Sequence, residues 1–328
     1  MSHRTDAYSI FINDTDKAKL SSQIGGIIEN YEKRTISNML KAKNGTPQGI
    51  AAMIYKRFVN SASQVYGTAR TALAGNKIVA PETVVNLDIK REIIEEVNKF
   101  DLETFGIPTL AEKRKENFRL SLNREMERKF FLTALTQGTQ TFAIDTSDIE
   151  GSLEAKIQAL ETLQNDYVDG VERDQMALVL KPAIFGKLKN KLNDTNNTIV
   201  TVEGEEIPAF NGVATFSSTY LPANVDAVLM VYGSIAQPLR VDEYGLDKIQ
   251  FSNDWALELF YDYGIKALAP DLVFVAITGA EADTAYSVVS ALPVTGEADT
   301  IYIVSGTGAM SIWDATGEEF VAYTGTLA

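Results

Sequence analysis

The chain has 328 residues, of which 45% are hydrophobic, so it can build one elaborate domain or two ordinary ones. It contains no cysteine, which excludes disulfides and thiolate zinc sites, and its single histidine is His3. Because chain ends often fray, we set aside histidine-based catalysis and histidine metal centres. No apolar run approaches the roughly 20 residues that span a bilayer, and no secretory signal is visible, so we expect a cytoplasmic protein without a membrane span.

The net charge of −14 is spread unevenly along the chain. Residues 1–140 carry a net +5, residues 141–280 a net −12 and residues 281–328 a net −7. No acidic residue lies between Glu32 and Glu82. From charge alone, the basic stretch in this gap is either a solvated face or a surface for an acidic neighbour or nucleic acid. Its members are Lys33, Arg34, Lys41, Lys43, Lys56, Arg57, Arg70 and Lys77.

The first third of the chain predicts two extended segments. Residues 1–65 mix polar runs with short apolar ones, which indicates an N-terminal arm with one or two short helices. Residues 66–105 predict an extended hairpin loop that leaves the arm near Val65 and turns near Gly75. Its returning limb alternates apolar and polar residues, as a strand does.

A long helix is predicted within residues 106–151. Thr109 and Glu112 have the spacing of a capping box, so we expect the helix to start there. Glu125 and Lys129 have the spacing of a favourable pair along the helix. An apolar stripe with a period of four predicts core packing and not a cofactor pocket. The stripe consists of Phe118, Leu122, Met126 and Phe130.

Residues 152–240 predict helices packed over a sheet. We expect a helix from Ser152, a buried strand at Met176–Leu180 and a helix that opens at Pro182. Short strands follow, around residues 199–202, 206–209, 213–216 and 227–232.

Two further strands are predicted in residues 241–279, and a separate module after them. Alternation from Trp255 to Tyr263 indicates one strand, and the apolar run at 271–277 indicates a buried one. Residues 280–328 contain no lysine or arginine and predict a small β module of short strands.

A passage within residues 241–279 resembles one in the major capsid proteins of tailed bacteriophages, the family named after the Hong Kong 97 shell. That passage has the pattern Tyr-Gly-x-Lys-x-x-x-Pro, which here is Tyr263, Gly264, Lys266 and Pro270. The order of arm, extended hairpin, spine helix, axial domain and returning peripheral strands is similar to this family from about residue 30 to residue 279.

The resemblance implies an α+β capsid fold in which residues 1–65 form the arm, 66–105 the hairpin, 106–151 and 241–279 the peripheral domain, and 152–240 the axial domain. It implies that the chain assembles with itself into pentamers and hexamers of an icosahedral shell. It also implies a separate scaffolding protein, a portal and packaged double-stranded DNA as partners, in a virion assembled in a bacterial cytoplasm. The basic stretch would then meet neighbouring subunits or DNA.

The acidic module at 280–328 is predicted to lie on the outer surface, away from DNA. Its aromatic residues Tyr302, Trp313 and Tyr323 have two interpretations: a surface that binds glycans or an accessory protein, or the small core of the module itself.

The sequence also bears on two other classes of function, a wall-anchored protein and an enzyme. Residues 292–296 spell Leu-Pro-Val-Thr-Gly, the signal by which sortases anchor wall proteins, so a surface adhesin or wall-associated binding protein is the alternative. No apolar span and basic tail follow this signal. The chain has no phosphate-binding loop, and Glu205 and Glu206 are paired acids in a predicted loop. We therefore expect no enzymatic activity, no cofactor and no bound metal.

Overall fold

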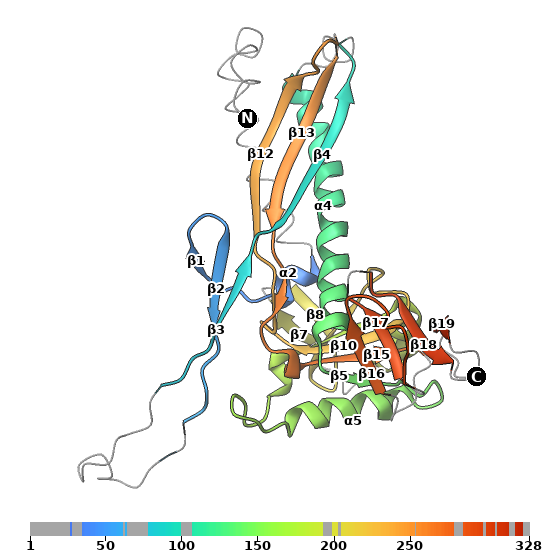
Figure 1. The fold of residues 1–328 in the computed structure, drawn as a ribbon. Coiled ribbons are helices and arrows are strands. Elements are labelled where there is room, and N and C mark those ends of the chain that lie inside the picture. The colour runs from blue at the N-terminus through green and yellow to red at the C-terminus, as the bar shows by residue number, and fades with distance from the viewer. Residues whose placement is uncertain are drawn as a thin grey trace, which may run out of the picture.

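A computed structural model describes residues 27, 35–61, 63, 78–99, 107–192, 199–202, 205–252, 254–278, 285–297, 300–305, 307–314 and 319–323. They form a mixed α+β molecule with a long upper part and a broader lower part (Figure 1). Among these residues no helix is both long and apolar enough to cross a bilayer.

The lower part is built on a seven-stranded sheet, here called the axial sheet. Neighbouring strands are antiparallel except for β5 with β15 and β6 with β9, which are parallel. Every residue of β6 and β15 is buried, which confirms the prediction of buried strands in these two regions. In order across the sheet the strands are β5 (Gln140–Phe142), β15 (Val273–Ile277), β10 (Val225–Val231), β6 (Met176–Leu180), β9 (Val213–Ser217), β8 (Glu205–Phe210) and β7 (Ile199–Val202).

Both faces of the axial sheet are covered, because successive residues of a strand point to opposite sides. Leu178 and Phe274 pack in a core with helices α5 (Ile149–Glu161) and α6 (Pro182–Leu192). Val179 and Val275 pack on the other face. The prediction of helices over this sheet is therefore confirmed.

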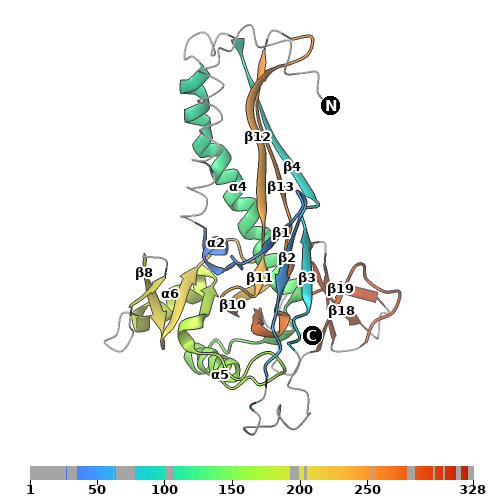
Figure 2. The same ribbon diagram turned by 90° about the vertical axis from the view of Figure 1, so that its left-hand side faces the viewer.

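The upper part pairs the long helix α4 (Ile107–Gln137) with a three-stranded sheet, here called the peripheral sheet (Figures 1 and 2). At 1.5 Å per residue, the 31 residues of α4 span about 46 Å. The predicted stripe Phe118, Leu122 and Met126 packs on this sheet, and Phe130 packs on the axial sheet. In order the strands are β12 (Leu239–Lys248), β13 (Trp255–Tyr263) and β4 (Ile89–Val97).

The hairpin begins earlier in the chain than predicted. Strand β2 (Ala52–Lys56) pairs with β1 (Thr46–Gln48) on one side and β3 (Glu82–Asn86) on the other. The outgoing limb thus starts at Ala52 and not near Val65, inside the segment assigned to the arm. The turn predicted near Gly75 lies outside the described residues.

The last four strands form a separate sheet, here called the C-terminal sheet, which confirms a β module in this region. Its order is β16 (Ala285–Val289), β17 (Thr300–Val304), β18 (Met310–Asp314) and β19 (Glu319–Ala322). Ile301, Ile303, Met310 and Tyr323 join the same hydrophobic core as the axial sheet and the end of α4. The module is therefore packed on the body of the molecule.

Short elements complete the fold. Helix α2 precedes the hairpin, and β11 pairs with β14 below α4. Single 3₁₀ turns, η2 and η3, precede β6 and β15. Their bounds are Ile36–Leu40 for α2, Ile235–Ala236 for β11, Lys266–Ala267 for β14, Arg173–Gln175 for η2 and Pro270–Leu272 for η3.

Two local predictions were wrong. Helix α4 begins at Ile107, so Thr109 lies inside its first turn and is not the N-cap. Helix α5 begins at Ile149, where the side chain of Asp148 accepts from the Gly151 amide, and Ser152 lies within the helix. The strand predicted from Trp255 to Tyr263 is confirmed as β13, and eight of its nine residues are buried.

Candidate assembly surfaces

The described limbs of the hairpin carry apolar side chains that the described part of the subunit leaves more than half exposed. Beyond β2 and β3 the limbs stay joined, because the Val59 amide donates to the Val79 carbonyl at 2.9 Å. Phe58, Ile78 and Val79 are 61%, 82% and 52% exposed. A two-stranded ribbon is marginally stable in water by itself, and clustered exposed apolar residues mark interaction sites. This ribbon is a candidate contact surface.

Glu125 couples the spine helix α4 to the peripheral sheet. Its carboxylate accepts hydrogen bonds from the hydroxyls of Tyr261 at 2.6 Å and Tyr263 at 2.9 Å, and from Nε of Arg91 at 2.8 Å. The two tyrosine rings stack with their centroids 6.3 Å apart. Burial, followed by the adjacent Glu125 carboxylate, raises the pKa of both hydroxyls. We predicted a pair with Lys129, but these contacts direct Glu125 across the interface with the sheet.

Gly264, from the Tyr-Gly pattern, joins the peripheral sheet to the base of the hairpin. A Cβ atom at this position would lie 2.0 Å from the carbonyl oxygen of Asn86, at the end of β3. The Gly264 amide also donates to the Pro238 carbonyl. The missing side chain therefore lets two backbones approach closely, which gives the glycine of this pattern a physical reason.

Helix α2 is attached to α4 by a buried carboxylate. The Ser37 amide donates to Oε1 of Glu127 at 2.7 Å, and the Glu127 side chain is nearly inaccessible to solvent. Its Oε2 has no hydrogen-bond partner within the described structure. Burial raises the pKa of Glu127, and the hydrogen bond from the Ser37 amide opposes the rise. The hydrogen bond therefore offsets only part of the free-energy cost of burying the ionised Glu127 carboxylate.

The Glu127→Gln variant should show the cost of this buried charge. A pKa raised above the ordinary 4.5 means that Glu127 contributes stability below that pH and loses it as pH rises through its folded value. We expect the variant to be more stable than the parent at neutral pH by about 1–3 kcal/mol, with the difference shrinking toward pH 4.5. Urea unfolding across this range measures it, and Glu112→Gln on an exposed part of α4 is the control. A pH-independent difference would contradict the assignment.

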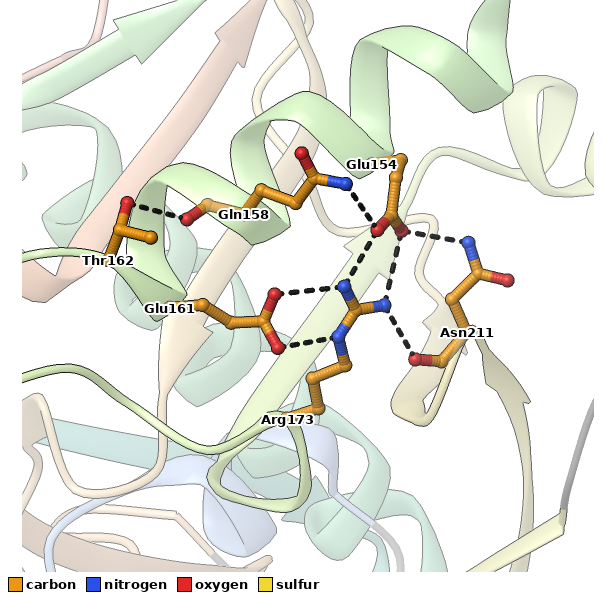
Figure 3. Close-up of polar contacts among 6 residues, drawn as sticks. All are labelled: Glu154, Gln158, Glu161, Thr162, Arg173 and Asn211. Carbon is orange, nitrogen blue, oxygen red and sulfur yellow. Dashed lines mark hydrogen bonds and ion pairs between the residues drawn. The ribbon is translucent and has the colours of Figure 1, made fainter.

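Arg173 ties α5 to the turn between β8 and β9 (Figure 3). Its guanidinium donates to both oxygens of Glu154 at 2.7 and 3.2 Å, to both oxygens of Glu161 at 2.7 and 2.9 Å, and to the Asn211 carbonyl at 3.0 Å. The Asn211 side chain in turn donates to Glu154. Asn211 and Gly212 both have positive φ, which suits an Asn-Gly hairpin turn. This network fixes the β8–β9 turn of the axial sheet to helix α5, which covers the sheet.

The Arg173→Met variant should remove an acid-sensitive part of the stability. The Arg173 guanidinium, with hydrogen bonds from Asn211 and Gln158, lowers the pKa of Glu154 from 4.5 to about 2. Glu154 therefore contributes stability above pH 4.5, and loses it as pH falls toward 2. We expect the variant to lower the free energy of unfolding by roughly 2 kcal/mol at neutral pH, a value discounted because the ion pairs are partly exposed. The loss should be smaller below pH 4. Urea unfolding tests this, with exposed Lys187→Met as control; an equal loss at every pH would argue against the network.

Two of the four described members of the predicted basic stretch form ion pairs within the subunit. Lys56 forms an ion pair with Glu82 across the hairpin at 2.7 Å, and Arg57 forms one with Asp271 at 2.6 Å. Lys41 and Lys43 lie between α2 and β1, and Lys43 is exposed. A role for the stretch toward neighbours or DNA stays a prediction. The other four residues lie outside the described part of the chain: Lys33, Arg34, Arg70 and Lys77.

The aromatic residues of the C-terminal module are not an open surface. Tyr302 and Tyr323 are buried, and Tyr323 belongs to the core shared with the axial sheet. Trp313 is half-buried and, like Tyr302, packs edge-on against Phe320. This burial agrees with the interpretation that the aromatics form a core, and it removes Tyr302 and Tyr323 from the surface predicted to bind glycans.

Sequence reasoning did not find the partners of Glu125, Glu127 or Arg173. Charged residues usually lie in solvent, and each of these gains its partners from segments distant in the chain. The only available signal was Asn211-Gly212, a dipeptide typical of tight hairpin turns.

Comparison with known proteins adds evidence on the fold. No protein-family model matches the sequence, and no curated protein matches it. The solved capsid of the cyanophage P-SCSP1u is similar over 74% of this chain and 88% of its own, with a TM-score of 0.54 and 14% identity. The capsid of an empty GTA particle is similar over 74% of this chain and 88% of its own, with a TM-score of 0.51 and 11% identity.

A virus-like particle from Pyrococcus furiosus is similar over 80% of this chain and the whole of its own, with a TM-score of 0.50 and 12% identity. The C-terminal sheet lies outside the region matched to the phage capsids. The chain therefore has the α+β fold of Hong Kong 97-like capsid proteins, with the C-terminal sheet as an addition to it.

Proposed function

We propose that this chain is the major capsid protein of a tailed double-stranded DNA phage and that it assembles into pentamers and hexamers of an icosahedral shell. The observation that carries the proposal is the fold, which is similar to the cyanophage capsid over 74% of this chain. The elongated subunit suits a wall that is one molecule thick (Figure 2).

The hairpin supports this proposal because its exposed apolar residues require cover. In a closed symmetric assembly, each subunit offers the same surfaces to its neighbours, so one contact is repeated around the shell. Phe58, Ile78 and Val79 would lie against the next subunit and gain burial that the isolated ribbon lacks. A separate scaffolding protein and a portal complete the proposed set of partners.

The charge distribution supports an inner and an outer side. The described part of the C-terminal module contains acidic Glu297, Asp314 and Glu319, of which the last two lie in its sheet, and the sequence has no lysine or arginine after Lys266. Packed DNA would repel such a surface, so we place the C-terminal sheet on the outside of the virion.

The adhesin alternative receives no support from the sortase-like segment. Gly296 packs against the module, since a Cβ atom there would lie 2.6 Å from Cβ of Trp313. The Glu297 amide also donates to the Tyr302 hydroxyl at 2.8 Å. The C-terminal end of the segment is thus folded onto the module, whereas an anchoring signal must enter an enzyme cleft as an extended peptide.

Nuclease protection tests the proposed function. Particles that contain the chain are isolated from lysates of the producing cells, treated with nuclease, and assayed for DNA that co-sediments with the 36.0-kDa subunit. We expect protected double-stranded DNA inside filled particles. Particles that never protect DNA would contradict a phage capsid and would indicate a shell for another cargo.

A further inference from the structure

The outgoing limb of the hairpin is bound to the lower part of its own subunit. Nη1 and Nη2 of Arg57 donate to the two carboxylate oxygens of Asp271 at 2.6 and 2.7 Å. The two side chains are 24% and 29% exposed, so the pair is partly shielded from solvent. A bidentate arginine–carboxylate pair fixes orientation as well as distance, because both groups are planar. Asp271 lies in η3, directly before strand β15 of the axial sheet.

Asp271 is held in place for this contact from a second direction. Nδ2 of Asn165 donates to Oδ2 of Asp271 at 2.7 Å. Oδ1 of Asn165 accepts from the amides of Tyr167 and Val168, both at 2.9 Å, which closes the loop after α5 into an Asx turn. The acceptor for Arg57 is therefore part of a loop with its own internal hydrogen bonds.

The same loop contacts the limb at two more points. The Arg57 guanidinium lies over the Tyr167 ring, 4.3 Å from its centroid, in a cation–π contact. Three residues farther along the limb, the Asn60 amide donates to the Asp166 carbonyl at 2.8 Å. Contacts at Arg57 and Asn60 together prevent the limb from pivoting about a single point.

These contacts also hold the returning limb, because the two limbs are joined beside them. The Arg57 amide donates to the Pro81 carbonyl at 3.3 Å, and the Val59 amide donates to the Val79 carbonyl at 2.9 Å. The neighbouring Lys56 differs from Arg57, since its partner Glu82 belongs to the hairpin itself. Lys56 links limb to limb, whereas Arg57 links the hairpin to the axial part of the molecule.

We propose that Arg57, Asp271, Asn165 and Tyr167 form a clamp that sets the direction of the hairpin within the free subunit, before any neighbour is bound. The ribbon with Phe58, Ile78 and Val79 then projects at a fixed angle from the axial sheet. The role of this angle in assembly rests on the proposed function: a hairpin already aimed at its neighbour loses less conformational freedom on binding.

A distance measurement between two spin labels tests the clamp in the free subunit. The chain has no cysteine, so cysteines at Ile78 on the hairpin and Ala159 on an exposed face of α5 label uniquely. Double electron–electron resonance then reports the distribution of distances between them. We compare the parent with Arg57→Ala, and with Lys56→Ala as the matched control one residue away.

The clamp predicts one narrow distance peak in the parent and in Lys56→Ala, and loss of that peak in Arg57→Ala. Asp271→Asn keeps the size of the side chain and should also lose the peak, so it serves if Arg57→Ala fails to fold. Circular dichroism melting confirms folding of each variant. A narrow peak that survives in the folded variants, or a broad one in the parent, would overturn the proposal.

Particle formation by the same variants is scored separately. If the labelled parent shows the narrow peak but builds no shells under any condition, the proposed function fails and the clamp stands. If the parent builds shells while folded Arg57→Ala keeps the narrow peak, the clamp fails and the proposed function stands.

Discussion

Gly264→Ala is expected to destabilise the subunit by about 3 kcal/mol or more, although it adds a single methyl group. The new Cβ would lie 2.0 Å from the Asn86 carbonyl oxygen and 3.1 Å from Cγ1 of Val85. The first of these is a backbone atom, so it cannot yield by a change of rotamer. Relief requires the base of the hairpin to move away from the end of β13.

Equilibrium unfolding in urea measures this loss, with Gly186→Ala as the matched control. Gly186 lies inside α6, and a Cβ there would meet no atom within 4 Å. Alanine should therefore stabilise that helix by about 0.5–1 kcal/mol. Equal stability of Gly264→Ala and the parent would show that the two backbones are not in close contact.

Ile303→Ala is expected to cost about 2–5 kcal/mol, the usual range for removing a buried isoleucine side chain from a core. Ile303 is fully buried in the core that contains Val273 and Val275 of the axial sheet. Gly308 in the adjoining turn packs on α4, since a Cβ there would lie 2.6 Å from Cδ1 of Leu132. We therefore expect the C-terminal sheet to unfold in one transition with the axial and peripheral sheets, which α4 joins.

Val294→Ala in the same module is the control for this prediction. Val294 is 95% exposed, so its truncation should change the stability by less than about 0.5 kcal/mol. Urea unfolding followed by tryptophan fluorescence reports the module through Trp313 and the peripheral sheet through Trp255. Separate transitions for the two tryptophans, with Ile303→Ala affecting only one, would make the module an independent appendage.

Elements with a strong local pattern could be predicted from the sequence. Helix α4 has an apolar period of four, and β6 and β15 are short apolar runs, so the local sequence pattern indicates their conformation. The order of these elements also supported the resemblance to capsid proteins. That resemblance correctly implied the fold but not the contacts that hold it together.

Elements that depend on distant partners could not be predicted in this way. Strand β12 was missed because five of its ten residues are charged and it forms an edge of the peripheral sheet. Strand β13 was predicted, but its alternating polarity did not show that neighbouring strands and α4 cover it, or that its buried Asp262 pairs with Arg240 at 2.6 Å. The partners of Asp262 and Glu127 lie far away in the chain, where no periodicity reveals them.

For the candidate assembly surfaces too, the sequence showed the residues but not their contacts or exposure. The basic stretch was visible as a gap in acidic residues, but the sequence could not show that Lys56 and Arg57 are paired within the subunit. Isoleucine and phenylalanine are usually buried, and only the structure shows that the described part of the subunit leaves Ile78 and Phe58 exposed. Exposure is a property of the packed molecule and not of the residue type.

The mass and electron-microscope appearance of the expressed 328-residue chain, alone and with scaffolding proteins from its own genome, test the central claim most directly. Self-assembly predicts closed icosahedral particles, or rings of five and six, whose mass is a whole-number multiple of the 36.0-kDa subunit. A folded chain that stays monomeric under every condition would contradict the proposal that it builds a shell.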